Sequence, residues 1–434
     1  MQEILLNLEG WRLRHARYGE GWEICLERVL AYDSLSSAEL LALQKARLSQ
    51  FADKAKKTAA WLDLEELSLE SLPDLPILTK AKVLSNIETF ITPNRDRLIS
   101  AHTSGSTGAG LQFCKTLIGE MEQWAVWWRY RMRHGIAFNQ LCGYFGGRTI
   151  VPAKEKSRYW RFNRPANQLM FSAYHLTSKT VRNYLKKLDE LKVEWLHGYP
   201  SFLAQVANLA MSENCSRKVQ TKVVTIGAES LLPAQKKVIE DFFQAPVRQH
   251  YGLAEGVANI SECPHGKLHV DEDFSFVEFL PILGQKNQYK IIGTGWSNTA
   301  FPLFRYDTGD VATISDENAQ CSCGLIGRVV DAIDGRKEDY IFLADGTKVG
   351  RMDHLFKDVK GIAEAQLIQE KEGELLALLV KNIHYTEQTL TQLNQEVDRR
   401  FSDKLHLTIE FTDKISRTKN GKLRFVINRI VQKL

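Results

Sequence analysis

A nine-residue stretch rich in glycine and hydroxyl side chains interrupts an otherwise ordinary sequence. The stretch is "HTSGSTGAG", His102 to Gly110, and seven of its nine residues are Ser, Thr or Gly. Glycines allow close backbone approach, and hydroxyls with free N–H groups supply donors, so such a loop can close on a phosphate. A Walker-type loop ends in Gly-Lys-Ser/Thr and opens directly into a helix. Here "LQFCKTL" follows and alternates as a strand does. We therefore expect a loop between two strands, which taken alone could equally be a surface linker.

Four later segments carry residues suited to nucleotide chemistry. They are "YGLAE" (251–255), "RYDTGD" (305–310), "GRKED" (335–339) and "RTKNGKLR" (417–424). Each segment alone is weak evidence for a nucleotide site, because Asp-Gly and Asn-Gly turns are common and a charged tail is usually solvated. Their fixed order along the chain is the more specific signal.

The elements that must position these segments differ along the chain. Residues 1–95 show long amphipathic helical patterns, with Ser37 as the expected N-cap of one helix. Beyond residue 95, apolar runs such as "VEWLHGYP", "KVVTIGAES" and "VRQHYGLAE" alternate with helical segments such as "PSFLAQVANLA" and "LPAQKKVIEDFF". Strands that alternate with helices predict an α/β fold with mainly parallel sheets covered by helices.

The last hundred residues follow a different pattern. We expect hairpins that turn at Asp345-Gly346 and at Glu372-Gly373, then a helix over "TLTQLNQEVDRRFSDKL", a strand over "LTIEF" and a polar tail. This is the pattern of a small α+β domain. We place the boundary in the charged stretch "DGRKED", which predicts a large domain over residues 1–335 and a small one over 336–434.

Composition sets broad limits on what the protein does. The 434 residues exceed what one core holds, and 44% hydrophobic with 25% charged residues is typical of a globular protein. The net charge of +5 is spread along the chain, which fits an acidic ligand but is most simply a solvated surface. We see no signal peptide and no membrane span, so we expect a cytoplasmic protein. Seven cysteines do not indicate a disulfide framework.

The ordered set "TSGSTGAG … YGLAE … YDTGD … GRKED … RTKNGK" resembles the signature of the adenylate-forming superfamily. The chain is most similar to its phenylacetate–CoA ligase branch, which includes relatives in capsular-polysaccharide biosynthesis. The resemblance runs from about residue 95 to the end. It implies that a carboxylate attacks the α-phosphorus of ATP, giving an acyl-adenylate and pyrophosphate, before a nucleophile takes the acyl group. It also implies that the small domain is mobile.

The resemblance assigns roles to the loop and to a lysine in the small domain. Lys422 would reach the bridging oxygen and the substrate carboxylate and stabilise charge as the adenylate forms. Thr107 would share in catalysis. The residues implied to hold the ATP phosphates are Thr103, Ser104, Gly105, Ser106, Thr107 and Gly108.

Further roles follow from the other motifs. Glu255 would bind Mg²⁺ and act in catalysis, and Asp310 would accept both ribose hydroxyls, as a carboxylate with two oxygens can. Arg336 would lie near the nucleotide. The residues implied to border the adenine are Gly227, Ala228 and Glu229, together with Tyr251 and its neighbour Gly252.

The sequence departs from the pattern of many relatives at two places. Where they carry Pro-Lys after the second Thr-Gly of the loop, this chain has Ala109-Gly110, and the next lysine is Lys115. The hinge position after Arg336 is Lys337 rather than an acidic residue. Whatever the missing lysine contributes in those relatives must come from elsewhere or be dispensable.

Two cysteine- and histidine-containing segments suggest a second metal. "ECPHGKLHVDED" and "CSCGLIGR" hold the two ligand types that zinc selects, and a structural site needs four of them. A bare C-x-C is also common in unremarkable turns. By likeness to members of the phenylacetate–CoA ligase branch, the expected structural zinc ligands are Cys263, His269, Cys321 and Cys323, with His265 in reserve.

The acceptor of the acyl group is not encoded in these motifs. The leading hypothesis is transfer to coenzyme A, which would make the protein an acyl- or aryl-CoA ligase. The alternative is amide formation on an amine or amino sugar for a surface polysaccharide. A catalytically inactive nucleotide-binding protein is a remote third hypothesis, because Glu255, Asp310 and Lys422 are all retained.

The substrate pocket and the partners are only broadly indicated. Segments 142–147, 171–175 and 197–201 are candidates to line an acyl pocket, and their Phe and Tyr content is compatible with an aryl acid. We expect a small carboxylic acid as substrate and no nucleic acid as partner. The oligomeric state is open, with a homodimer as one option.

Overall fold

The computed structural model describes residues 2–102, 111–148, 150–152, 155–336, 341–346, 348–349, 352–356, 359, 361–417 and 423–430. The chain forms two compact units. Unit 1 comprises Met1–Asn7, Gln140–Gln249 and Gly335–Leu434, and unit 2 comprises Leu8–Asn139 and His250–Asp334. The division into domains 1–335 and 336–434 stays a prediction. No helix within the described part of the chain is long and apolar enough to cross a membrane.

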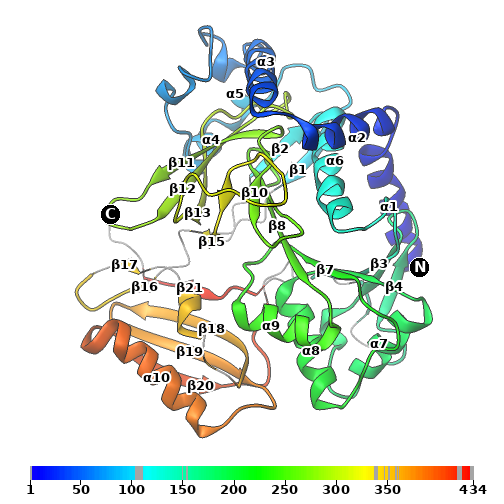
Figure 1. Ribbon diagram of the computed structural model, residues 1–434, viewed down its shortest axis with the longest axis vertical. Helices are drawn as coiled ribbons and strands as arrows, with labels where there is room; N and C mark the ends of the chain where they lie inside the picture. Colours follow the sequence, from blue (N-terminus) through cyan, green and yellow to red (C-terminus); the bar gives the residue numbers. More distant parts are fainter. Residues whose placement is uncertain are drawn as a thin grey trace. The chain divides into compact units, whose positions relative to one another are not determined.

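Unit 1 contains the expected parallel sheet, in the order β8-β7-β6-β3-β5-β4. All neighbours are parallel except the edge strand β4, which runs antiparallel to β5. Helices lie beside it in Figure 1. The elements are β3 (Cys142–Phe145), β4 (Trp160–Asn163), β5 (Gln168–Phe171), β6 (Trp195–Gly198), β7 (Val223–Ile226), β8 (Val247–Gly252), α7 (Val181–Glu190), α8 (Pro200–Ser212) and α9 (Pro233–Phe243).

The core of this sheet follows from the two periodicities of its elements. The strand β7 is buried along its length and is apolar except for Thr225, as expected for a strand covered on both faces. The helix α7 buries Val181, Tyr184, Leu185 and Leu188, which have the i, i+3, i+4, i+7 spacing of one helix face. These side chains join one hydrophobic cluster. The prediction of parallel strands covered by helices is therefore confirmed for this part of the chain.

The last hundred residues form a four-stranded sheet of order β20-β19-β18-β21, with α10 lying along one face (Figure 1). The hairpin at Glu372-Gly373 is confirmed, and Gly373 takes a φ of 74°, which favours glycine. The hairpin around Gly346 is confirmed as well. The C-terminal strand β21 was not expected. The elements are β16 (Ile341–Phe342), β17 (Lys348–Val349), β18 (Ile362–Lys371), β19 (Glu374–Lys381), α10 (Glu387–Phe401), β20 (His406–Phe411) and β21 (Val426–Asn428).

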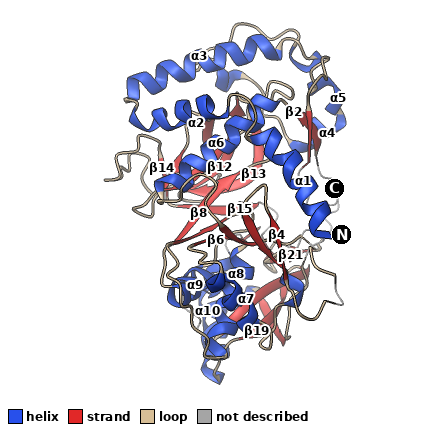
Figure 2. Ribbon diagram, turned by 90° about the vertical axis from the view of Figure 1, so that its right-hand side faces the viewer, coloured by secondary structure: helices blue, strands red, loops and turns tan. Residues whose placement is uncertain are grey.

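Unit 2 combines the expected N-terminal helices with antiparallel sheets that the sequence did not indicate. Figure 2 shows the helices α2, α3 and α6. They are α1 (Gln2–Arg17, continuing from unit 1 at Leu8), α2 (Trp22–Ala31), α3 (Ser37–Ala55), α4 (Lys80–Ser85), α5 (Ile87–Phe90) and α6 (Leu117–Arg133). The predicted N-cap of α3 was wrong by one residue. Ser36 is the cap and forms a capping box with Glu39, because its extended backbone, unlike that of the helical Ser37, lets its hydroxyl reach the Glu39 N–H.

The strands of unit 2 form three antiparallel arrangements. One pairs β1 with β2, one has the order β11-β12-β13-β15, and one runs β14-β10-β9 and then the last residues of β8. The strands are β1 (Ile99–His102), β2 (Gln112–Lys115), β9 (Asn259–Glu262), β10 (Leu268–Val270), β11 (Ser275–Pro281), β12 (Gln288–Gly295), β13 (Tyr306–Thr313), β14 (Val329–Val330) and β15 (Ala332–Arg336).

The glycine- and hydroxyl-rich loop has the predicted context. Its residues 103–110 lie outside the described part of the chain, but β1 and β2 on either side pair antiparallel with His102 opposite Gln112. The helix α6 begins only at Leu117, after the N-cap Thr116. The stretch therefore joins two strands, and the Walker arrangement is excluded.

A buried arginine ties α6 to the segment after β10. The Arg129 side chain is 1% exposed and bonds Asp271 at 2.9 Å and Asp273 at 2.7 Å, and it donates to the carbonyl of Val29 at 3.0 Å. Burial alone would lower the pKa of Arg129, but Asp273, Asp271 and Asp33 together raise it above its usual value.

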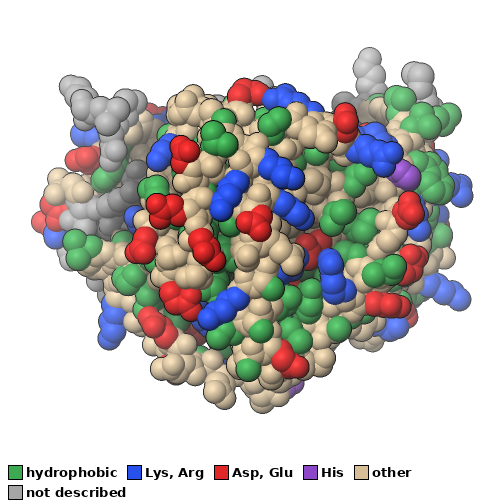
Figure 3. Space-filling model, turned by 90° about the horizontal axis from the view of Figure 1, so that it is seen from above, with side chains coloured by type: hydrophobic (Ala, Val, Ile, Leu, Met, Phe, Trp, Pro, Cys, Tyr) green, Lys and Arg blue, Asp and Glu red, His purple; other side chains and the backbone are tan. Residues whose placement is uncertain are grey.

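The surface differs from this interior, since acidic and basic side chains are interspersed on the face in Figure 3.

Arg129→Met should lower the free energy of unfolding of unit 2 by about 3–5 kcal/mol, because it removes the ion pair of the buried Asp273 and leaves Asp271 with only the longer contact to Arg133 at 3.3 Å. Urea unfolding followed by tryptophan fluorescence measures this change. Arg12→Met is the matched control, since Arg12 forms an exposed pair with Glu9 and its loss should cost under about 1 kcal/mol. Equal unfolding midpoints for the two variants would show that the buried cluster adds no stability.

Candidate functional site

A bulge in β13 presents the "TGD" residues of unit 2. Lys290 pairs with Val311 and Ile292 pairs with Asp307, so Thr308, Gly309 and Asp310 together face the single residue Ile291 of β12. Gly309 has a φ of 77°, and its N–H donates to the Asp307 carboxylate at 2.9 Å. Extra residues in one strand bend it and redirect its side chains, and such bulges are frequent beside active sites.

Asp310 meets Tyr251 in unit 2. The Tyr251 hydroxyl, from the end of β8, donates to Asp310 Oδ2 at 2.8 Å. Asp310 itself is buried, and its N–H donates to the Thr308 hydroxyl at 3.1 Å. Burial, followed by the charge of Asp310, raises the pKa of Tyr251 well above its usual value, so this tyrosine stays a neutral donor. Two motifs far apart in sequence are thus joined through one hydrogen bond.

Glu255 follows β8 and lies near the start of β13. Its carboxylate is buried and accepts a hydrogen bond from the Tyr306 hydroxyl at 3.4 Å. Gly256 next to it has a φ of 71°, so the chain turns sharply just after the carboxylate. The first residue of β13 therefore bonds the predicted magnesium ligand, while Asp310 sits further along the same strand.

Arg305 supports this strand in a way that the sequence did not reveal. It is buried, and its guanidinium makes two bonds to Glu278 at 3.0 and 2.9 Å. It also donates to the carbonyl of Leu75 at 2.5 Å, and its backbone φ of 46° is unusual for a residue with a side chain. A lone arginine before "YDTGD" gives no signal of this role, because Glu278 and Leu75 are distant in sequence.

The predicted acyl-pocket segments follow neighbouring parallel strands of unit 1. Segments 142–147, 171–175 and 197–201 contain or follow the carboxyl ends of β3, β5 and β6, and Gly227 directly follows β7. In open parallel sheets, ligands bind outside the carboxyl ends of the strands. A Cβ on Gly198 would lie 2.2 Å from the Phe145 carbonyl oxygen, so the end of β6 requires a glycine.

The segment Gly227 to Glu229 has its own geometry at this edge. Ala228 has a φ of 68°, a conformation that L side chains rarely adopt. Glu229 is partly exposed, and its two oxygens accept backbone N–H groups from Ser201 at 3.3 Å and Leu423 at 2.7 Å. Desolvation of its carboxylate raises the pKa of Glu229, against the effect of these bonds. The Glu229 side chain is thus already engaged by the protein.

Several of the predicted site residues lie partly or wholly outside the described part of the chain. Arg336 ends β15, but its side chain is outside the described part, and Lys337 is outside it entirely. The same holds for Lys422 in the small-domain motif. The predicted phosphate-binding residues outside the described part are Thr103, Ser104, Gly105, Ser106, Thr107 and Gly108.

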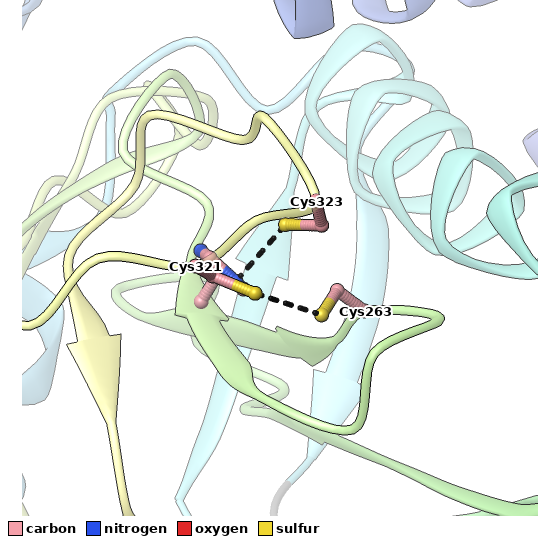
Figure 4. Close-up of side chains that lie close together, drawn as sticks. Cys263, Cys321 and Cys323 are labelled. Atoms are coloured by element: carbon pink, nitrogen blue, oxygen red, sulfur yellow. Dashed lines mark hydrogen bonds between the residues drawn. The ribbon is translucent and has the colours of Figure 1, made fainter.

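The four predicted zinc ligands lie together in unit 2. Their ligand atoms all lie within 4.8 Å of one another, and the three cysteines point toward each other in Figure 4. Cys263 Sγ is 3.8 Å from Cys321 Sγ, and Cys323 Sγ is 3.4 Å from His269 Nε2. Tetrahedral zinc with ordinary Zn–S and Zn–N bonds places sulfurs about 3.8 Å apart and sulfur and nitrogen about 3.5 Å apart. The donor set and the spacing both fit zinc.

The histidine of this cluster is oriented by the backbone. His269 Nδ1 lies 3.0 Å from the Gly327 carbonyl oxygen, which can only accept, so Nδ1 carries the proton and the lone pair is on Nε2. That is the nitrogen that faces Cys323, and such a second bond is typical of metal-ligating histidines. His265, the reserve ligand, instead bonds the Ser322 hydroxyl at 2.9 Å and is exposed.

Comparison by sequence points to CapK. A family model described as the CapK C-terminal domain matches residues 341–429. Protein CapK of Staphylococcus aureus is 28% identical over 446 residues, which cover 99% of this chain and 97% of that protein. The similarity therefore extends over both units.

Comparison by structure identifies the fold. A crystal structure of 2-hydroxyisobutyryl-CoA ligase in the postadenylation state, in complex with 2-HIB-AMP, superimposes with a TM-score of 0.70 at 17% identity, over 92% of this chain and 91% of that one. The anthranilate CoA ligase AuaEII in complex with anthranoyl-AMP superimposes with a TM-score of 0.50 at 12% identity. That match covers 76% of this chain and 66% of AuaEII. The suspected resemblance is confirmed, since the chain is similar to CapK along its length and has the fold of adenylate-forming CoA ligases.

Proposed function

We propose that this protein is an ATP-dependent carboxylate ligase that forms an acyl-adenylate and passes the acyl group to coenzyme A. The observation that carries the proposal is the bulged Thr308-Gly309-Asp310 turn, whose buried carboxylate is held by Tyr251. Bulges of this kind are frequent beside active sites, and a buried acid at the bulge suits a polar ligand. The fold shared with adenylate-forming ligases supports the same function.

Each residue has a distinct task in this proposal. Asp310 accepts the ribose hydroxyls, while the Tyr251 hydroxyl keeps its carboxylate in one orientation. The 103–110 loop binds the phosphates through backbone N–H groups and hydroxyls. Lys422 neutralises the charge that builds up as the substrate carboxylate meets the α-phosphate. The backbone of Gly227 to Glu229 borders the adenine.

Magnesium fits the environment of Glu255. Mg²⁺ is usually held by one or two carboxylates together with substrate phosphates, and Glu255 offers a buried carboxylate steadied by Tyr306. When bound, the ion would offset charge on the phosphates. Lys115 is not the missing loop lysine, because its ammonium group is buried and bonds Gln123 and Glu120.

The acceptor is the open part of the proposal. Coenzyme A is favoured because the structural neighbours named above are CoA ligases. Amide formation on an amine or amino sugar is the alternative, which the resemblance to capsular-polysaccharide relatives suggests. An inactive nucleotide-binding protein is the remote third reading, against which the buried, hydrogen-bonded states of Glu255 and Asp310 argue.

The wild-type protein should catalyse exchange of pyrophosphate into ATP with at least one acid from a panel of aryl and short-chain carboxylic acids. Lys422→Ala should reduce this exchange by about a hundredfold or more, because it removes the cation from the developing charge. Adding CoA or amino sugars to the active acid then identifies the acceptor. Absence of exchange with every acid would contradict both enzyme hypotheses, and normal exchange by Lys422→Ala would contradict the role of that lysine.

Asp310→Ala should raise the KM for ATP by about ten- to hundredfold, because two hydrogen bonds from the ribose to a charged acceptor are lost. Initial rates of pyrophosphate exchange against ATP concentration measure the change. Asp316→Ala is the control, since Asp316 is an exposed carboxylate in a turn that accepts from Asn318. An unchanged KM in Asp310→Ala would remove Asp310 from the nucleotide site.

We also propose a structural zinc ion held by Cys263, His269, Cys321 and Cys323. The purified protein should contain about one zinc per chain by elemental analysis, and Cys321→Ser should lose the metal and unfold at lower temperature. His265→Ala should keep the zinc, because His265 is hydrogen-bonded to Ser322 instead. If Cys321→Ser keeps its fold and activity with no metal bound, the zinc proposal fails.

A further inference from the structure

Glu229 joins three segments of unit 1 that are far apart in sequence. It lies just after β7, its Oε2 accepts the N–H of Ser201 at 3.3 Å, and its Oε1 accepts the N–H of Leu423 at 2.7 Å. Ser201 is in the first turn of α8, where the helix dipole favours a negative charge. One carboxylate thus connects the α8 N-terminus with the C-terminal segment.

An ion pair lies close to the Glu229 carboxylate. Glu364 on β18, which contacts α8, is buried and pairs with Arg417 at 2.5 Å. The charge of Arg417 also acts on Glu229, so one cation stabilises two carboxylates. Arg417 Nη2 makes the bond to Glu364, while Nη1 is buried and has no hydrogen-bond partner in the described part of the chain.

These two contacts lie on either side of Lys422 in the sequence. Arg417 is five residues before Lys422, and Leu423 directly follows it. The N–H of Leu423 belongs to the peptide group that joins it to Lys422, and that group is planar. A hydrogen bond to this N–H therefore restrains the described segment that begins directly after Lys422.

We propose that Glu229 is a positioning residue that holds the Leu423 N–H and so restrains the segment directly after Lys422 during formation of the acyl-adenylate. The inference rests on the proposed function, since it assumes that Lys422 acts in that half-reaction. Glu229 acts through Leu423 and needs no contact with the substrate. A carboxylate is required because two backbone N–H groups need two acceptor oxygens, and a glutamine amide supplies one.

Amide hydrogen exchange tests the contact without reference to activity. In the wild-type protein the Leu423 amide should exchange slowly, and in Glu229→Ala it should exchange at least about tenfold faster. The measurement is mass spectrometry with fragmentation of a peptide that begins at least two residues before Leu423, because the first amides of a peptide lose their label, and that ends near residue 430. Equal exchange of the Leu423 amide in the two proteins would overturn the inference, whether or not the protein forms adenylates.

Half-reaction kinetics test the consequence. Glu229→Ala should lower the kcat of ATP–pyrophosphate exchange by about ten- to hundredfold with little change in the KM for ATP. The kcat of Glu229→Gln should lie between those of Glu229→Ala and the wild type. Acyl transfer from a preformed acyl-adenylate should be unaffected. Equal loss in both half-reactions, or a wild-type rate in both variants, would overturn the positioning role.

Glu240→Ala is the matched control for loss of a carboxylate that accepts a backbone N–H. Glu240 accepts the Val247 N–H at 3.0 Å in the same unit, and its removal should leave the exchange of the Leu423 amide unchanged. If Glu229→Ala does not fold, Glu229→Gln carries both measurements. Lack of adenylation by the wild type would reject the proposed function, and the amide-exchange result would still decide the contact.

Discussion

The buried guanidinium of Arg129 is the interaction on which the arrangement of unit 2 depends. It lies on α6, the helix that follows the strand β2 of the predicted phosphate loop. Its partners Asp271 and Asp273 directly follow β10, which carries the zinc-cluster residue His269. A buried ion cluster is costly unless its geometry is satisfied, and here Asn259 and Ser261 also donate to Asp271. The loop strand and the cysteine cluster are therefore tied to one network.

Three of the unusual backbone conformations in the described part of the chain lie beside the predicted nucleotide-binding motifs. Ala228 and Arg305 have positive φ values without being glycine, and Gly309 lies in the bulge of β13. Such conformations cost of order 1–3 kcal/mol each and persist only where surrounding bonds enforce them. Arg305 has those bonds through Glu278 and Leu75. Each position adjoins a segment that the sequence motifs had already singled out.

Much of the fold could be predicted from sequence because local patterns determine it. The largely apolar strand β7, the helical face of α7 and the turn at Gly373 can each be recognised from a few neighbouring residues. The antiparallel sheets of unit 2 could not be predicted in the same way. Their strands pair at separations such as Leu268 with Val330, which no local pattern specifies. The cysteine cluster could be predicted only in part. Its residue types can be read from the sequence, but their closeness in space depends on the long-range pairing of β10 with β14.

The three acidic residues assigned to the nucleotide differ in what already holds them. Asp310 and Glu255 are each steadied by a tyrosine hydroxyl, a neutral donor that leaves the charge of the carboxylate in place. Glu229 instead accepts two backbone N–H groups, one per oxygen, and lies within the field of Arg417. A carboxylate used in this way is part of the framework rather than a ligand-binding group. The contribution of the Gly-Ala-Glu segment to a nucleotide would then come from its backbone, whose path the positive φ of Ala228 sets.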